Sequence, residues 1–187
     1  MATHAKERKI LFMGFRSVGK SSLIIQFVEN QFVDNYEPTI ENTFQKTFKS
    51  GGQDFNLQVV DTAGQDEYSI MPQSYFMNIN GYVIVYSVNS EKSFKVAQNV
   101  YDKLRDMKGE LGVPVILVGN KKDLRMERVI SFEEGKKMAD SWKAPFLEAS
   151  AKENPVHSVR EVFEKIIHVI TTQENGGVQN KSSCVLS

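Results

Sequence analysis

Short apolar runs alternate with helical patterns along most of the chain, in the order typical of α/β domains with a mostly parallel sheet. Residues 10–13, 82–88 and 115–119 are nearly continuous apolar runs, which predicts buried strands. Further strands are expected at residues 43–49, 55–61 and 145–148. The Ser50-Gly51-Gly52-Gln53 link predicts a hairpin turn, so one edge of the sheet should be antiparallel.

Apolar residues at helical spacing predict helices between the strands, and their apolar stripes should face the core. These helices are expected at residues 22–28, 93–107, 131–142 and 156–170. Beyond Thr172 the sequence turns polar and cannot bury enough surface to order itself. We therefore expect a flexible arm at residues 1–7, one globular domain at 8–172 and a mobile tail at 173–187.

The composition fits one domain that works in a reducing compartment. With 187 residues and 41% hydrophobic content, the chain can bury a full core but is too short for two ordinary domains. Its 23 basic and 23 acidic side chains cancel, which gives no reason to expect a nucleic-acid partner. We expect no secretory signal, and the single cysteine excludes an internal disulfide. A monomer is expected.

The octet Gly14-Phe15-Arg16-Ser17-Val18-Gly19-Lys20-Ser21 fits the phosphate-loop pattern of Gly, four residues, then Gly-Lys-Ser. It lies between a predicted strand and a predicted helix. Helix N-termini leave backbone N–H groups unpaired, so such a loop can wrap them around phosphate oxygens. Lys20 would neutralise the β- and γ-phosphates, and the Ser21 hydroxyl would hold Mg²⁺. The alternative is a glycine-rich turn that binds nothing.

A second motif, Asp61-Thr62-Ala63-Gly64-Gln65, ends the predicted strand at 55–61. A carboxylate at the carboxyl end of such a strand can reach Mg²⁺ through water. The Gly64 backbone can approach a γ-phosphate because no Cβ obstructs it, and Gln65 could orient an attacking water. Asp and Gly also cluster in ordinary turns, so this motif gains weight from its spacing to the phosphate loop.

Base identity is predicted from Asn120-Lys121-Lys122-Asp123, which directly follows the strand at 115–119. A carboxylate accepts two hydrogen bonds from neighbouring donors, and guanine offers such a pair whereas adenine does not. Asp123 would therefore select guanine, Asn120 would brace the loops, and the aliphatic stem of Lys121 could lie on the base. A backbone N–H in Ser150-Ala151-Lys152, most simply that of Ala151, could meet guanine O6.

Together these motifs resemble those of the Ras superfamily of small GTPases over residues 8–170. Within it the chain is most similar to the Rheb subfamily, because of Arg16-Ser17, the segment Tyr36-Glu37-Pro38-Thr39-Ile40-Glu41-Asn42-Thr43-Phe44, and the terminal Cys184-Val185-Leu186-Ser187. The resemblance implies the P-loop GTPase fold: an α/β domain with a six-stranded mixed sheet, one antiparallel edge strand and five flanking helices. It also implies that residues 36–44 are switch I, and that residues 61 to about 77 contain switch II.

The resemblance assigns functional residues to four groups. Catalytic roles are expected for Gln65, Thr39 and Lys20, and Mg²⁺ ligation for Ser21, Thr39 and Asp61. Contacts with GTP or GDP are expected from Ser17, Val18, Gly19, Lys20, Ser21, Ser22, Val33, Tyr36, Thr39, Gly64, Asn120, Lys121, Asp123, Ser150, Ala151 and Lys152. Effectors would bind Tyr36, Glu37, Pro38, Thr39, Ile40, Glu41, Asn42, Thr43 and Phe44.

The switch itself follows from the phosphate contacts. Thr39 can give both a hydroxyl to Mg²⁺ and a backbone N–H to the γ-phosphate, and Gly64 supplies the matching N–H. When the γ-phosphate leaves, both loops lose the contacts that ordered them. The alternative for Tyr36, Pro38 and Ile40 is an extended edge that packs against the sheet. The resemblance implies a rapamycin-sensitive kinase complex as effector and a tuberin-type GTPase-activating protein as partner.

Arg16 departs from the pattern of typical Ras relatives, which have glycine at this position. It could act as an arginine finger in cis, or it could obstruct the γ-phosphate while its side chain projects into solvent. We favour obstruction, because nothing in the sequence fixes such a side chain in one geometry. The role of Gln65 is open to the same question. A slow GTPase and a nearly non-hydrolysing, GTP-loaded interaction module are therefore both considered, and an ATPase or nucleotide kinase is disfavoured by Asp123.

Cys184-Val185-Leu186-Ser187 is a prenylation signal, in which the terminal serine favours a farnesyl group on Cys184. The alternative is an incidental cysteine four residues from the end. One lipid gives reversible anchoring, and residues 179–183 offer a single lysine and no second cysteine. We expect exchange between the cytosol and the cytoplasmic face of internal membranes of the lysosome, Golgi and ER.

Overall fold

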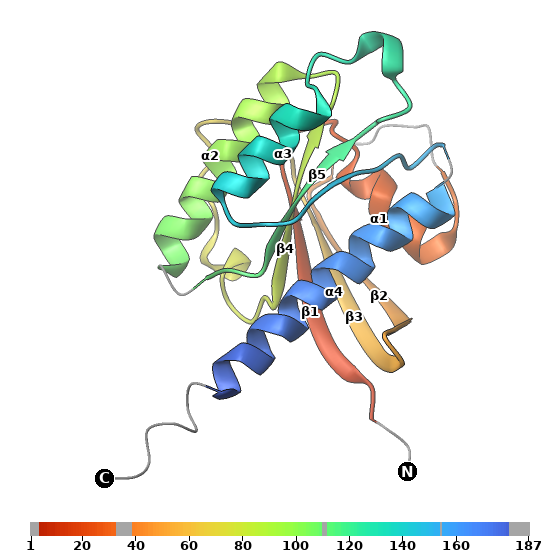
Figure 1. Ribbon diagram of the computed structural model, residues 1–187, viewed down its shortest axis with the longest axis vertical. Helices are drawn as coiled ribbons and strands as arrows, with labels where there is room; N and C mark the ends of the chain where they lie inside the picture. Colours follow the sequence, from red (N-terminus) through yellow and green to blue (C-terminus); the bar gives the residue numbers. More distant parts are fainter. Residues whose placement is uncertain (1–3, 33–38, 110–111, 154, 180–187) are drawn as a thin grey trace.

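The computed structural model describes residues 4–32, 39–109, 112–153 and 155–179. Six strands form one sheet in the order β2-β3-β1-β4-β5-β6 (Figure 1). The strands are β1 (Lys6–Met13), β2 (Glu41–Ser50), β3 (Gln53–Thr62), β4 (Gly81–Ser87), β5 (Val115–Asn120) and β6 (Phe146–Glu148). Only the β2–β3 pair is antiparallel among the strand pairs within these ranges. The predicted mixed sheet with one antiparallel edge strand is confirmed.

The hairpin between β2 and β3 turns where the sequence predicts it. Gly51 and Gly52 have φ values of +56° and +79°, a left-handed conformation that L side chains rarely adopt. Two such residues in a row are typical of the tight turn that suits the twist of an antiparallel pair. The flanking Ser50 and Gln53 are directly paired, so the register of β2 against β3 begins at the turn.

Four α-helices accompany the sheet in the part of the chain that the structure describes. They are α1 (Lys20–Glu29), α2 (Glu91–Lys108), α3 (Phe132–Ser141) and α4 (Pro155–Gln179). This is one helix fewer than the resemblance implies, because the segment between β3 and β4 forms only a single 3-10 turn, Gln73–Tyr75. Pro72 precedes this turn and lacks a backbone N–H, which disfavours a longer helix. No helix within the described ranges is both long and apolar enough to cross a membrane.

The helices form a layer on each face of the sheet (Figure 1). Residues of α1 and α4 share one hydrophobic core with the sheet, and residues of α2 and α3 share the other. Every residue of β4 and β5 is buried, as the continuous apolar runs predict for central strands. The loops at the carboxyl ends of β1, β4 and β5 therefore extend from a rigid base.

Both predicted domain boundaries differ from the observed elements. β1 begins at Lys6, because Lys6 already pairs with Phe55 of β3, so the strand includes part of the expected flexible arm. α4 continues to Gln179, seven residues beyond the boundary expected at Thr172. The helix gains a long-range contact there, since Arg8 Nη2 lies 2.6 Å from Glu174 Oε2.

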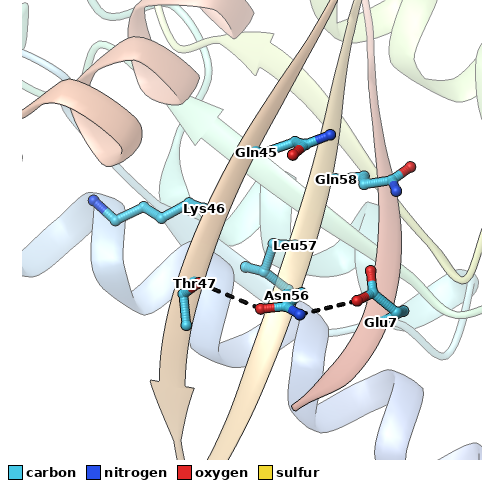
Figure 2. A pocket seen from close by; sticks show the side chains of 7 residues that line it. All are labelled: Glu7, Gln45, Lys46, Thr47, Asn56, Leu57 and Gln58. Atoms are coloured by element: carbon cyan, nitrogen blue, oxygen red, sulfur yellow. Dashed lines mark hydrogen bonds between the residues drawn. The ribbon is translucent and has the colours of Figure 1, made fainter.

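A shallow polar hollow of about 330 Å³ lies over β1, β2 and β3 (Figure 2). In it Thr47 Oγ1 donates to Asn56 Oδ1 at 3.3 Å, and Asn56 Nδ2 donates to Glu7 Oε1 at 2.9 Å. Its remaining lining residues are Gln45, Lys46, Leu57 and Gln58. Glu7 lies near the start of β1, whereas the phosphate loop follows the end of that strand. The hollow is therefore separate from the predicted nucleotide site.

Candidate nucleotide-binding site

The phosphate loop connects β1 to α1 and lies directly against the ends of neighbouring strands. Gly14 has φ +140°, and a Cβ there would lie 2.1 Å from the carbonyl oxygen of Val85 on β4. Gly19 has φ +94°, and a Cβ there would lie 2.3 Å from Nδ2 of Asn120, at the end of β5. Only glycine fits these two positions. The loop is therefore held tightly at both of its glycines, with the N-terminus of α1 facing the site.

Lys20, the first residue of α1, points its buried side chain back into this loop. Its Nζ donates to the carbonyl oxygens of Gly14 and Phe15, both at 3.0 Å. Burial lowers the pKa of Lys20 to about 8, and the nearby Asp61 carboxylate opposes that shift. The two loop carbonyls thus orient the Lys20 ammonium group within the loop that is predicted to bind phosphate. The predicted nucleotide contacts included neither Gly14 nor Phe15. Gly14 could have been found from the sequence, because it is the first glycine of the phosphate-loop motif.

The three predicted metal ligands come together beside Lys20. Ser21 Oγ donates to Asp61 Oδ2 at 2.5 Å and lies 2.9 Å from Thr39 Oγ1. Thr39 Oγ1 in turn lies 3.5 Å from the same carboxylate oxygen. These residues come from α1, the end of β3 and the chain before β2, so the fold rather than local sequence assembles them.

This cluster fits a magnesium ion. Asp61 is 1% exposed, and its Oδ1 has no hydrogen-bond partner among the described residues. Burial raises the pKa of Asp61, while hydrogen bonds from Ser21 and Thr39 and the charge of Lys20 oppose the shift. A buried carboxylate oxygen without a partner is costly, and Mg²⁺ prefers oxygen ligands of this kind. Ser21, Thr39 and Asp61 could therefore hold Mg²⁺.

The predicted base-binding residues lie in two joined loops, after β5 and after β6. Ser150 Oγ donates to Asp123 Oδ1 at 2.6 Å, which orients the carboxylate. The backbone N–H of Lys122 donates to the carbonyl oxygen of Ala149 at 3.2 Å and links the two loops. Burial lowers the pKa of the half-buried Lys121, whose φ is +63°. This arrangement is consistent with the stem of Lys121 lying against an aromatic base.

Gln65 does not point its amide toward the nucleotide site. The side chain is 5% exposed, and its Oε1 accepts a hydrogen bond from the backbone N–H of Gly14 at 2.6 Å. Its Nε2 donates to Thr62 Oγ1 at 2.9 Å and to the carbonyl oxygen of Ala63 at 2.5 Å. With three hydrogen bonds inside the protein, the amide is not arranged to orient an attacking water in this conformation.

Arg16 lies on the rim of the loop, with an exposed side chain whose Cζ is 5.4 Å from the Phe15 ring centroid. Its backbone is tightly packed against Gly64, where a Cβ would lie 2.4 Å from Arg16 Cα. Gly64 is thus needed for the approach of the 61–65 motif to the phosphate loop. The position of the Arg16 side chain agrees with the expectation that it projects into solvent.

The structure brings together most of the predicted nucleotide contacts at the carboxyl ends of β1, β3 and β5. Ile40 is 88% exposed, and Phe44 is half-buried against the core. Glu41, Asn42 and Thr43 are exposed on the edge strand β2. The remaining predicted residues, Val33, Tyr36, Glu37, Pro38 and Cys184, lie outside the described residues.

Comparisons with known proteins show the family of the chain. The sequence model of the Ras family matches residues 9–172. The chain is 59% identical over 180 residues to the GTP-binding protein Rheb of Homo sapiens, and the match covers 96% of this chain and 97% of that protein. It is 57% identical over 182 residues to the GTP-binding protein Rheb homolog of Drosophila melanogaster, with 97% and 98% covered. The GTP-binding protein rhb1 of Schizosaccharomyces pombe is 50% identical over 170 residues, or 91% of each chain.

Proposed function

This chain belongs to the Ras family and is similar to proteins of the Rheb subfamily, and on that premise we propose that it is a slow GTPase switch. In this proposal it binds GTP or GDP with Mg²⁺, and its surface differs between the two nucleotide states. The observation that carries the proposal is the convergence of Ser21, Thr39 and the buried Asp61 beside Lys20. Oδ1 of Asp61 has no hydrogen-bond partner among the described residues.

Each residue of this cluster has a separate task. Lys20 would exchange the carbonyl oxygens of Gly14 and Phe15 for phosphate oxygens, since its Nζ already lies in the loop. Ser21 and Thr39 would turn their hydroxyl oxygens from Asp61 toward the metal. When bound, Mg²⁺ would neutralise charge on the β- and γ-phosphates. Asp123 would accept hydrogen bonds from guanine, which distinguishes GTP from ATP.

A slow rate is supported by the two residues that would otherwise speed hydrolysis. The Gln65 amide is bonded to Gly14, Thr62 and Ala63, away from any attacking water. Arg16 is exposed on the loop rim, and within the described residues no carboxylate or carbonyl oxygen fixes its guanidinium. Catalytic groups need a fixed geometry, so neither side chain is prepared to stabilise the transition state.

The same observations favour a second candidate, a nearly non-hydrolysing module that remains loaded with GTP. The two candidates are separated by the nucleotide bound to the purified protein and by single-turnover hydrolysis in Mg²⁺. A measurable conversion of bound GTP to GDP supports the switch, whereas GTP that persists indefinitely supports the module. Replacing Arg16 with glycine tests obstruction, because a large fall in rate would show that Arg16 acts as a catalytic group.

Binding of effectors is proposed at residues 39–44 together with exposed apolar side chains of the chain after β3. Ile40, Tyr68 and Ile70 are between 87% and 93% exposed. Large exposed apolar side chains that lie near a nucleotide site are typical of a binding surface. The resemblance points to a rapamycin-sensitive kinase complex as effector and to a tuberin-type GTPase-activating protein. Thr39→Ala should retain GDP and lose effector binding; unchanged effector affinity of the GTP-loaded variant would contradict the assignment.

Membrane association is proposed through a farnesyl group on Cys184, on the basis of the terminal sequence alone. A single lipid would give reversible binding to internal membranes, with exchange through the cytosol. Mass spectrometry of the mature protein tests the modification. Fractionation of cells that produce Cys184→Ser tests its role, and a variant that stays on membranes without the lipid would contradict the proposal.

A further inference from the structure

Lysines of α2 hold the chain that follows Gln65, residues 66–77, hereafter the 66–77 segment. Lys103 Nζ donates to the carbonyl oxygen of Glu67 at 3.0 Å and to that of Ser69 at 2.9 Å. Lys108 Nζ donates to the carbonyl oxygen of Phe76 at 2.6 Å. In Figure 1 this chain, between β3 and β4, runs along α2. One helix thus binds the segment at three backbone positions.

These bonds replace the ones that a helix would make. In an α-helix each carbonyl accepts the N–H four residues later, but the carbonyls of Glu67 and Ser69 accept from Lys103 instead. A local turn supports this course, since Asp66 Oδ1 accepts from the backbone N–H of Tyr68 and from Ser69 Oγ, both at 2.9 Å. A charged donor that binds two carbonyls forms stronger hydrogen bonds than a neutral donor does. Lys103 therefore stabilises the extended turn against a helical alternative.

The position of this turn is coupled to Gln65, which lies only two residues before Glu67. The backbone N–H of Gln65 donates to the carbonyl oxygen of Gly14 at 3.0 Å, and its side chain accepts from the N–H of Gly14. Both ends of the short stretch from Gln65 to Ser69 are therefore fixed, one on the phosphate loop and the other on α2. The Gln65 amide can turn toward the nucleotide only if this stretch moves.

We propose that Lys103 is a positioning residue that slows GTP hydrolysis, because it holds the carbonyls of Glu67 and Ser69 and so keeps Gln65 turned inward. The inference rests on the proposed GTPase function and names a determinant of its rate. Loss of the Lys103 ammonium should raise the population of conformations in which Gln65 faces the nucleotide. Hydrolysis should then become faster, and the gain should require the Gln65 amide.

The test is single-turnover hydrolysis of preloaded GTP in Mg²⁺ by the full chain. Lys103→Met should raise the rate about fivefold, as a shift of a minor conformation would. Lys103→Arg keeps a cationic donor and should stay within about twofold of the wild-type rate. Lys95→Met is the matched control, because Lys95 is exposed on the same helix and pairs with Glu91 at 2.8 Å. In a Gln65→Leu background, Lys103→Met should change nothing.

Hydrogen exchange gives an independent measure of whether a variant has lost the hydrogen bonds from Lys103 to the 66–77 segment. Amides of residues 66–72 should exchange faster in Lys103→Met than in Lys95→Met, and bound GTP shows that each variant is folded. Lys103→Gln also removes the ammonium group and replaces Lys103→Met in this test if that protein cannot be produced. The proposal is overturned if exchange quickens without any gain in rate, or if the gain persists in the Gln65→Leu background. Failure of the wild-type protein to bind GTP with Mg²⁺ would instead refute the proposed function.

Discussion

Asn120 Nδ2 donates to the carbonyl oxygen of Val18 at 2.8 Å and so joins the end of β5 to the phosphate loop, across 102 positions in the sequence. Asn120 is 2% exposed, and a Cβ on Gly19 would collide with its amide. The amide therefore fits into the loop rather than lying beside it. Through this contact, the loop proposed to bind the base and the loop proposed to bind the phosphates form one rigid unit.

Asn120→Ala should weaken nucleotide binding more than it weakens the fold. The carbonyl of Val18 would lose its donor at a buried position, a loss of about 1–3 kcal/mol, or about 5- to 150-fold in affinity. Dissociation of a fluorescent GDP analogue measures the effect. Asn56→Ala is the control, because the Asn56 side chain bonds Thr47 and Glu7 on the polar sheet surface. This variant should release GDP at the wild-type rate. Equal rates for the two variants would show that the brace is dispensable.

Removal of Mg²⁺ should speed the release of nucleotide. Without the ion, Asp61 and the phosphates would face each other with uncompensated negative charge, since Asp61 Oδ1 has no other described partner. We expect EDTA to raise the GDP dissociation rate by about tenfold or more, because the metal binds only the loaded state tightly. Asp61→Asn should release GDP quickly with or without EDTA. If EDTA leaves the GDP dissociation rate of the wild-type protein unchanged, this would argue against a metal at this cluster.

The sheet could be predicted because its determinants are local. The apolar runs at residues 82–88 and 115–119 match strands β4 and β5 to within one residue at each end. The hairpin turn could also be predicted from the sequence, since two glycines in a row between strands are typical of a tight turn with positive φ, as Gly51 and Gly52 have. The meeting of Ser21 with Asp61 could be anticipated from the motifs, because the carboxyl ends of parallel strands meet at one edge. Thr39 precedes the antiparallel strand β2, so its place in the cluster was implied by the resemblance alone.

What could not be predicted depends on contacts between distant residues. The inward turn of Gln65 follows from the N–H of Gly14, 51 positions away. The extension of α4 depends in part on Arg8, which lies 166 positions from Glu174, whereas the local composition is that of a tail. Lys103 had no sequence signal at all, since a lysine on an amphipathic helix is ordinary.

The N-terminus of α3 should make stability depend on pH. Ser131 and Glu134 form a capping box, and hydrogen bonds from the Ser131 backbone N–H and hydroxyl lower the pKa of Glu134 below its ordinary value. A lowered pKa stabilises the fold at a pH above the unfolded-state value and loses that effect as the pH falls through the folded value. Thermal unfolding should show Glu134→Ala less stable than wild type at pH 7. The difference should shrink below about pH 4; a difference that persists there would contradict the assignment.

Two glycines in helices should respond to alanine in opposite directions. A Cβ on Gly135 of α3 would lie 2.4 Å from Phe146 Cζ and 2.4 Å from the Tyr86 hydroxyl. Two aromatic rings cannot easily move aside. The destabilisation from overpacking, about 1–3 kcal/mol, should therefore exceed the stabilisation of about 1 kcal/mol from the better helix propensity of alanine. Gly135→Ala should therefore lower the free energy of unfolding measured in urea.

Gly176→Ala should instead raise that free energy. A Cβ there would meet no atom within 4 Å, and α4 includes the residue. Alanine would then contribute only its helix propensity and its smaller unfolded-state entropy, together about 0.5–1 kcal/mol. The substitution also tests where α4 ends, because alanine has no such advantage in an unstructured tail. Unchanged stability would place the end of the helix before Gly176 and would limit the contribution of the Arg8–Glu174 ion pair.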